Sequence, residues 1–84
     1  VTTAGTKEAL ASSPTITNFI IITAETDNTG VIVVGASTVV ATLASRRGIP
    51  LNAGDSISLG GSDLAELYID STVSGDGVTY LYLT

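Results

Sequence analysis

Residues 17–25, TNFIIITAE, decide the fold of this chain. In an extended strand successive side chains point to opposite faces, so Phe19 and Ile21 lie on one face and Ile20 and Ile22 on the other. A strand that is apolar on both faces is buried on both sides, either in the core or at a contact between subunits. This stretch therefore predicts a central β-strand that is covered on each face.

The next two segments differ in how clearly they indicate a strand. Residues 31–34, VIVV, predict a second buried strand, and the turn residues 28–30, NTG, indicate that it forms a hairpin with residues 17–25. Residues 37–44 fit a helical stripe as well as a strand. We favour a strand there, because the segment is short and its valines are β-branched.

The second half of the chain predicts three more strands. Residues 56–59 alternate, and residues 67–70 follow a single helical turn expected at residues 63–66. Residues 75–77, GDG, indicate a tight hairpin turn before the last strand, residues 78–83. That strand has two distinct faces: Val78, Tyr80 and Tyr82 on one, and Thr79, Leu81 and Leu83 on the other.

Turn residues recur along the chain at the spacing of about 8–12 residues that is typical of sandwiches and barrels. We therefore predict an all-β fold, a small antiparallel β-sandwich or jelly-roll-like barrel of about seven short strands. Residues 1–84 are expected to form a single β domain. Residues 1–15 are small and polar, and are expected to be an edge strand or an extended arm.

The composition favours a domain that is supported by another protein surface. Hydrophobic residues make up 44% of the 84 residues and charged residues only 13%, and the mean hydropathy is +0.48. The core of so short a chain is marginal, and neither cysteine nor histidine is present to supply disulfides or the usual transition-metal ligands. We expect self-association or docking on a larger protein. A compact monomer with a polar surface rich in threonine and serine is the alternative.

The charge argues against nucleic acid and membranes as partners. The net charge is −5 and the isoelectric point is near 4.1, whereas phosphate contacts need clustered Lys and Arg. Apolar runs such as residues 19–22 are far shorter than the roughly 20 residues that span a bilayer. We expect no nucleic acid and no membrane among the partners.

The chain lacks the residues of common catalytic sites. It has no His or Cys to activate a nucleophile, and Lys7, its one lysine, lies in a polar N-terminal stretch. Asp63, Glu66, Asp70 and Asp76 are close in sequence, but their expected positions in turns and at strand ends indicate solvated carboxylates and not a catalytic pair. We expect no enzyme, no catalytic residue and no cofactor.

Two loops, residues 27–28 and 75–77, offer oxygen atoms that calcium could use. Neither follows the D-x-[DN]-x-[DN]-G pattern of a calcium loop, and the ability of Asp and Asn to form turns accounts for their presence. We expect no metal ion.

Four residues are candidates for an interface: Arg46, Arg47, Tyr80 and Tyr82. Arginine is favoured at interfaces because its planar guanidinium pairs with carboxylates, although a solvated loop or pairing with the chain's own carboxylates is the alternative. The two tyrosines form either an interface stripe or part of the core with satisfied hydroxyl groups. The absence of Trp disfavours a stacking platform for sugars.

Three segments, read together, resemble a known class of protein. They are residues 28–35, NTGVIVVG, residues 48–59, GIPLNAGDSISL, and residues 63–69, DLAELYI. In this order they resemble small β-sandwich or jelly-roll-like structural proteins of tailed bacteriophages, among them head decoration (cement) proteins and head-fibre or tail-tip modules. The similarity spans residues 17–83.

The resemblance implies a capsid decoration protein on the exterior of the virion. Such a protein binds the major capsid protein and stabilises the head against the pressure of packaged DNA, and the resemblance implies a homo-oligomer, with a trimer favoured. The contacts of this family are not coded in a motif, so no contact residue is transferred. The alternative is a receptor- or glycan-binding module of a phage tail or fibre.

Overall fold

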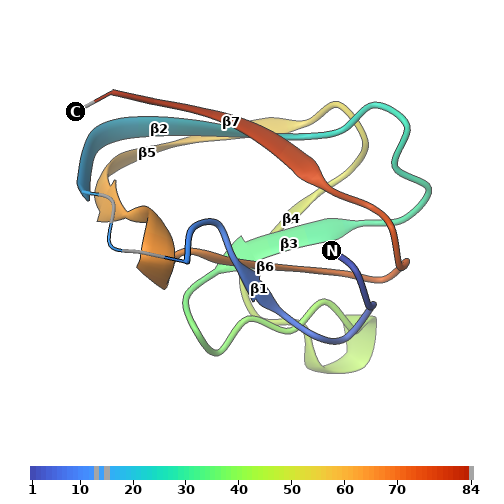
Figure 1. Ribbon diagram of the computed structural model, residues 1–84. Coiled ribbons are helices and arrows are strands. Elements are labelled where there is room, and N and C mark those ends of the chain that lie inside the picture. The colour runs from blue at the N-terminus through green and yellow to red at the C-terminus, as the bar shows by residue number, and fades with distance from the viewer. Residues whose placement is uncertain (13, 15, 84) are drawn as a thin grey trace.

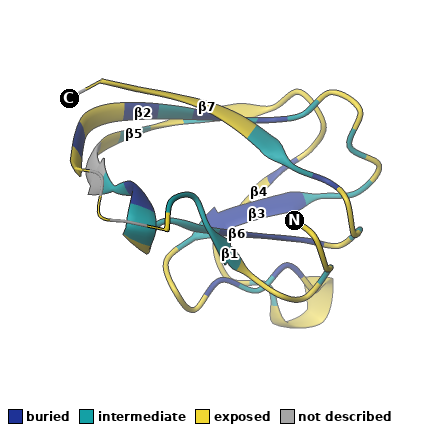
Figure 2. Ribbon diagram, in the orientation of Figure 1, coloured by how far each residue is buried: buried dark blue, intermediate teal, exposed yellow. Residues whose placement is uncertain are grey.

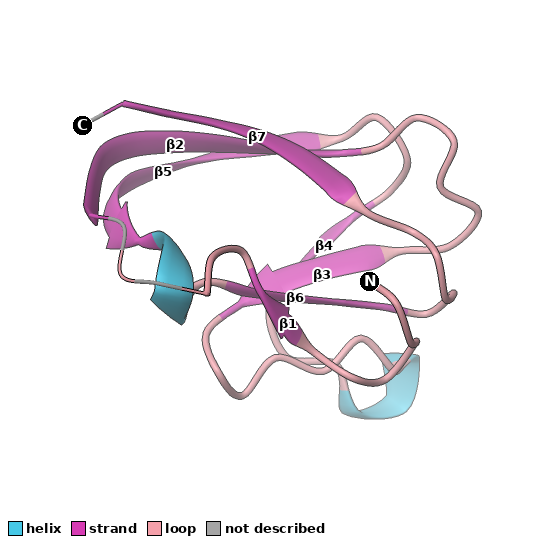
Figure 3. Ribbon diagram, in the orientation of Figure 1, coloured by secondary structure: helices cyan, strands magenta, loops and turns pink. Residues whose placement is uncertain are grey.

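The computed structural model describes residues 1–12, 14 and 16–83, which form two antiparallel β-sheets packed face to face (Figure 1). One sheet has four strands in the order β1-β6-β3-β4, and the other has three in the order β5-β2-β7. The seven strands of this part of the chain are β1 Glu8–Ala9, β2 Ile16–Ala24, β3 Ile32–Gly35, β4 Ile49–Leu51, β5 Ser56–Asp63, β6 Tyr68–Ser71 and β7 Val78–Leu83. Two short 3-10 helices, η1 Leu43–Ser45 and η2 Leu64–Glu66, connect them (Figure 3). The predicted all-β sandwich is confirmed.

β2 is the central strand of the three-stranded sheet and pairs with β5 on one side and β7 on the other. Ile20, Ile22 and Ala24 point into the sandwich and are fully buried. Phe19 and Ile21 alternate with them and face outward. The described residues thus bury the inner apolar face of this strand and leave Phe19 on the outer face 37% exposed.

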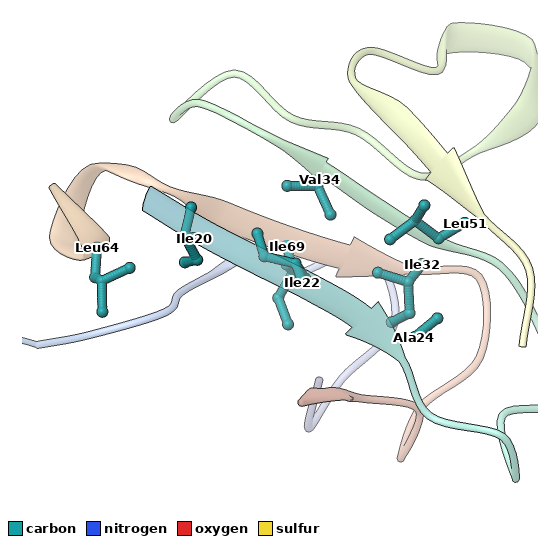
Figure 4. Packing of buried hydrophobic residues seen from close by; sticks show 8 residues of the cluster. All are labelled: Ile20, Ile22, Ala24, Ile32, Val34, Leu51, Leu64 and Ile69. Carbon is teal, nitrogen blue, oxygen red and sulfur yellow. The ribbon is translucent and has the colours of Figure 1, made fainter. Parts of the chain in front are cut away.

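The core lies between the two sheets (Figure 4). Eight buried side chains form it, and they come from four strands and from η2: Ile20, Ile22, Ala24, Ile32, Val34, Leu51, Leu64 and Ile69. Asp63 accepts a hydrogen bond from the backbone N–H of Ala65 at 3.0 Å and so caps η2. This cap fixes the helical turn that places Leu64 in the core.

The two predicted hairpins are wrong, because the strands that they would join belong to different sheets. β3 lies in the four-stranded sheet, where it pairs with β4 and β6 and not with β2. The residues before β3 and those before β7 both cross from one sheet to the other. The two crossing segments are hydrogen-bonded to each other. The Asn28 amide donates to the Gly77 carbonyl at 2.8 Å and accepts from the Gly77 N–H at 2.9 Å.

The segment after β3, residues 36–48, is a loop that contains η1, so the strand that we favoured at residues 37–44 is wrong. Its backbone forms an isolated bridge between Val40 and Arg47. Its buried side chains pack on the outer side of the four-stranded sheet, in a second small cluster of Val33, Val39 and Ala41. The loop therefore covers the part of the outer face of that sheet that contains Val33.

Residues 1–11 lie against the four-stranded sheet. β1 pairs with β6 at the edge of this sheet, and the Leu10 N–H donates to the Leu67 carbonyl at 2.9 Å. The Thr2 N–H donates to the Glu8 carboxylate at 2.6 Å, and this hydrogen bond lowers the pKa of Glu8 below its ordinary value. The N-terminal segment is thus an arm that contains a two-residue edge strand.

Candidate interaction surface

The outer face of the three-stranded sheet is exposed and uncharged, and is called the open face below. The strand register arranges its outward side chains in three rows across β5, β2 and β7: Gly60, Phe19 and Leu83; Ser58, Ile21 and Leu81; Ser56, Thr23 and Thr79. None of these nine residues carries a charge. Phe19 is 37% exposed, Leu81 60% and Leu83 57%. Four of the nine are large and apolar, and a cluster of exposed apolar side chains is typical of an interaction site.

The outer face of the other sheet is covered around Val33. Val33 of β3 points away from the main core, yet it is fully buried because the loop of residues 36–48 packs over it. Figure 2 shows the difference, with β3 buried and most of β7 exposed. The two layers of the sandwich are therefore protected unequally, and the open face is the unprotected side.

Two shallow depressions lie at one end of the open face. One, of about 210 Å³, is lined by Ile21, Thr23, Thr79, Tyr80 and Leu81. The other, of about 290 Å³, shares Thr23 and Thr79 with the first and extends to Glu25 and Asp27. Both open broadly to solvent, a shape that suits the side chains of a partner protein better than an enclosed small molecule.

Tyr80 and Tyr82 extend the apolar surface around the edge of β7. They belong to the inward row of this strand, opposite Ile22 and Ile20, but they are 42% and 38% exposed because β7 is an edge strand. Their rings are stacked, with centroids 6.2 Å apart, and the Tyr80 hydroxyl donates to the Leu10 carbonyl at 3.4 Å. The two tyrosines are therefore exposed at the rim of the sandwich and are not core residues of this chain.

Arg46 and Arg47 lie in the loop on the opposite side of the sandwich (Figure 1). The Arg46 Nε donates to the Ala41 carbonyl at 3.0 Å, which ties this guanidinium to its own loop. The Arg47 backbone pairs with Val40, and its side chain is exposed. The four predicted interface residues thus fall in two separate places, and the structure does not bring the arginines and the tyrosines together.

Two carboxylates that we expected to be solvated are buried, so that expectation is wrong for Asp70 and Asp76. Asp70 is 1% exposed and accepts hydrogen bonds from the backbone N–H groups of Gly5, Ala41 and Ser71 at 2.8–3.0 Å. Its carboxylate joins the N-terminal arm and the loop of residues 36–48 to β6. It is used for structure, since its acceptor positions face backbone donors.

Asp76, which is 5% exposed, joins the segment before β7 to the segment before β3. Its oxygens accept from the Thr29 N–H at 3.1 Å and the Gly30 N–H at 2.8 Å. The two loops that offer possible calcium ligands therefore lie side by side. The oxygen atoms of Asn28 and Asp76 accept hydrogen bonds from backbone N–H groups of the opposite loop. Within the described residues, no group of three or more His, Cys, Asp or Glu side chains could hold a metal ion.

Phe19, Leu81 and Leu83 were not among the predicted interface residues. The signal for them was the apolar pattern on both faces of their strands, which predicts a cover on each side. Alternation alone does not show which face of a strand packs against the rest of the chain. In the described structure the inner face of this sheet packs against the four-stranded sheet, and Phe19, Leu81 and Leu83 lie on the outer face.

No helix in the described ranges is long and apolar enough to cross a membrane. Comparisons of the chain with protein-family models, with curated proteins and with solved structures give no match. The fold and the open face are therefore the observations on which a function can be based.

Proposed function

We propose that this chain is a capsid decoration protein of a tailed bacteriophage, which binds the outer surface of the head through its open face. The observation that carries the proposal is the exposed, uncharged surface that contains Phe19, Ile21, Leu81 and Leu83. Large contiguous apolar patches are uncommon on monomeric proteins and mark interaction sites. The resemblance of three segments to virion structural proteins suggests the partner, the major capsid protein.

The proposed mechanism is mechanical and requires no chemical step. Apolar surface removed from water contributes about 25 cal/mol per Å², and an uncharged face avoids the cost of desolvating charges. A decoration protein that contacts two capsid subunits joins them, because the second contact is effectively intramolecular once the first is made. Many modest contacts over the head then oppose its expansion.

Co-sedimentation of the purified chain with undecorated heads of the phage that encodes it tests the proposal. The wild-type chain should sediment with the heads. Phe19→Thr removes a ring from the open face but keeps a residue that favours strands, and it should weaken binding about tenfold. Leu43→Thr is the control, because Leu43 is 78% exposed on η1, away from the open face, and this variant should bind like the wild type.

A folded chain that does not bind these heads would contradict the proposal. Equal loss of binding in the Phe19 and Leu43 variants would place the contact elsewhere. Binding to host cells or glycans without binding to heads would select the alternative, a receptor- or glycan-binding module of a tail or fibre.

A further inference from the structure

The outer edge of β7 is open in the described structure. β7 is the last strand in the order β5-β2-β7, so one side of it pairs with β2 and the other has no strand beside it in the part of the chain that the structure describes. It is six residues long and contains no charged residue, no proline and no glycine. A sheet edge presents unpaired N–H and C=O groups to which another strand can add.

The other three sheet edges carry features that limit strand addition. β1 has only two residues, and β4 has three, with Pro50 in the middle. β5 contains Gly60-Gly61 and ends at Asp63. Short length, proline and charge are the means by which proteins protect sheet edges, and glycine weakens a strand. Among these four edges, only β7 combines useful length with an unprotected sequence.

We propose that β7 pairs with β7 of a second copy of this chain, antiparallel about a twofold axis, which gives a dimer in place of the trimer that the resemblance favours. The pairing joins two three-stranded sheets into one six-stranded sheet. With Leu81 opposite Leu81 of the second copy, Tyr80 lies opposite Tyr82. Directly opposed residues of an antiparallel pair lie on the same face of the sheet, so tyrosines meet tyrosines on one face and leucine meets leucine on the other.

A second copy suits this edge because it brings no like charge to it. The chain has a net charge of −5, yet β7 and the open face contain no charged residue. An antiparallel pair of identical strands has the twofold symmetry that is commonest among homo-oligomers. Identical strands are also equal in length, so every residue of β7 that lies near the axis finds a partner.

The exposed area is sufficient for a reversible dimer. Tyr80 is 42% exposed, Leu81 60%, Tyr82 38% and Leu83 57%. With about 200 Å² for each large side chain, these fractions leave about 400 Å² per copy. Full burial of this area in two copies, with their backbone edges, gives an upper limit on the order of 1,000 Å², which is in the range of weak, transient interfaces. Leu81 and Leu83 belong to both the strand edge and the open face, so the pairing covers part of these two side chains and leaves the outward residues of β2 and β5 exposed. The pairing does not rest on the proposed function.

Light scattering of the purified chain over a rising concentration series tests the pairing. The mass should rise from the 8.4 kDa of one chain to twice that value. Leu81→Lys places like charges opposite each other at the axis and should keep the chain monomeric at every concentration. Leu43→Lys makes the same change at an exposed leucine of η1 and should dimerise like the wild type. Circular dichroism shows whether each variant is folded.

A cysteine variant tests the position of the contact and serves if Leu81→Lys does not fold. The chain has no cysteine, so Leu81→Cys introduces a single thiol. Opposed residues have Cβ atoms about 4.5–5.5 Å apart, near the reach of a disulfide, and mild oxidation should give a covalent dimer. Leu43→Cys should stay monomeric under the same conditions.

Three outcomes would overturn the pairing. They are a wild-type chain that stays monomeric up to its solubility limit, a trimer, and a dimer that Leu81→Lys leaves unchanged. A monomeric chain that still binds heads would remove this inference and leave the proposed function intact. A dimer that does not bind heads would contradict the proposed function and leave the pairing of β7 intact.

Discussion

Asp70 shows how a single buried carboxylate can replace missing strand pairing. It lies on β6, and its two oxygens accept from Gly5 in the N-terminal arm and from Ala41 in the loop after β3. Neither segment has a long ladder of its own, since the arm contains only a two-residue strand and the loop an isolated bridge. Hydrogen bonds to an ionised acceptor are stronger than those between neutral groups. One residue thus fixes two irregular segments against the same sheet.

Asp70→Asn should therefore destabilise the fold far more than its small change in shape suggests. The NH2 group that replaces one carboxylate oxygen donates and cannot accept, so at least one buried backbone N–H loses its partner. We expect a loss of about 3 kcal/mol in the free energy of unfolding, measured by urea denaturation. The control, Asp27→Asn at an exposed turn position, should change it by less than about 0.5 kcal/mol. Similar losses in the two variants would show that the buried carboxylate has no special role.

At the scale of elements, local patterns predicted the strands better than their partners. The alternation of residues 17–25 and 78–83 is a property of each segment alone, and both are strands with the predicted faces. Pairing depends on which apolar faces cover each other across the whole chain. β2 pairs with β5 and β7, both distant in sequence, and the turn residues 28–30 serve a crossing between sheets instead of a hairpin.

The same limit applies to the loop after β3 and to the candidate site. Residues 37–44 have strand-like valines, but Val39 and Ala41 are buried as a cover over β3, and Asp70 satisfies the Ala41 N–H. Tyr80 and Tyr82 were selected as candidates and lie at an exposed edge. Phe19 was not selected, because a strand with two apolar faces does not reveal which face its own chain leaves open.

β2 offers a direct test of which of its side chains hold the sandwich together. Ile22→Ala removes a fully buried side chain from the core and should lower the free energy of unfolding by about 2–5 kcal/mol. Ile16→Ala makes the same change on the same strand at a position that is 69% exposed, and it should cost less than about 1 kcal/mol. Urea denaturation of both variants measures the difference. Equal costs would contradict the assignment of the core to the inner face.

For the whole molecule, the notable property is the unequal protection of its two layers. The loop of residues 36–48 covers the outside of the four-stranded sheet around Val33, whereas the open face and the edge of β7 remain exposed. A small domain gains stability when such a surface is buried on a partner. We propose that the open face binds a head and that the edge of β7 pairs two copies. The two surfaces share Leu81 and Leu83.

We propose that this chain stabilises a phage head by binding to it. The most direct measurement is scanning calorimetry of undecorated heads with and without a saturating amount of the chain. We expect the chain to raise the temperature at which the heads come apart, since a ligand that binds only the intact assembly shifts the equilibrium toward it. Phe19→Thr at the same concentration should give a smaller rise. Heads that come apart at the same temperature with and without the folded chain would contradict the account.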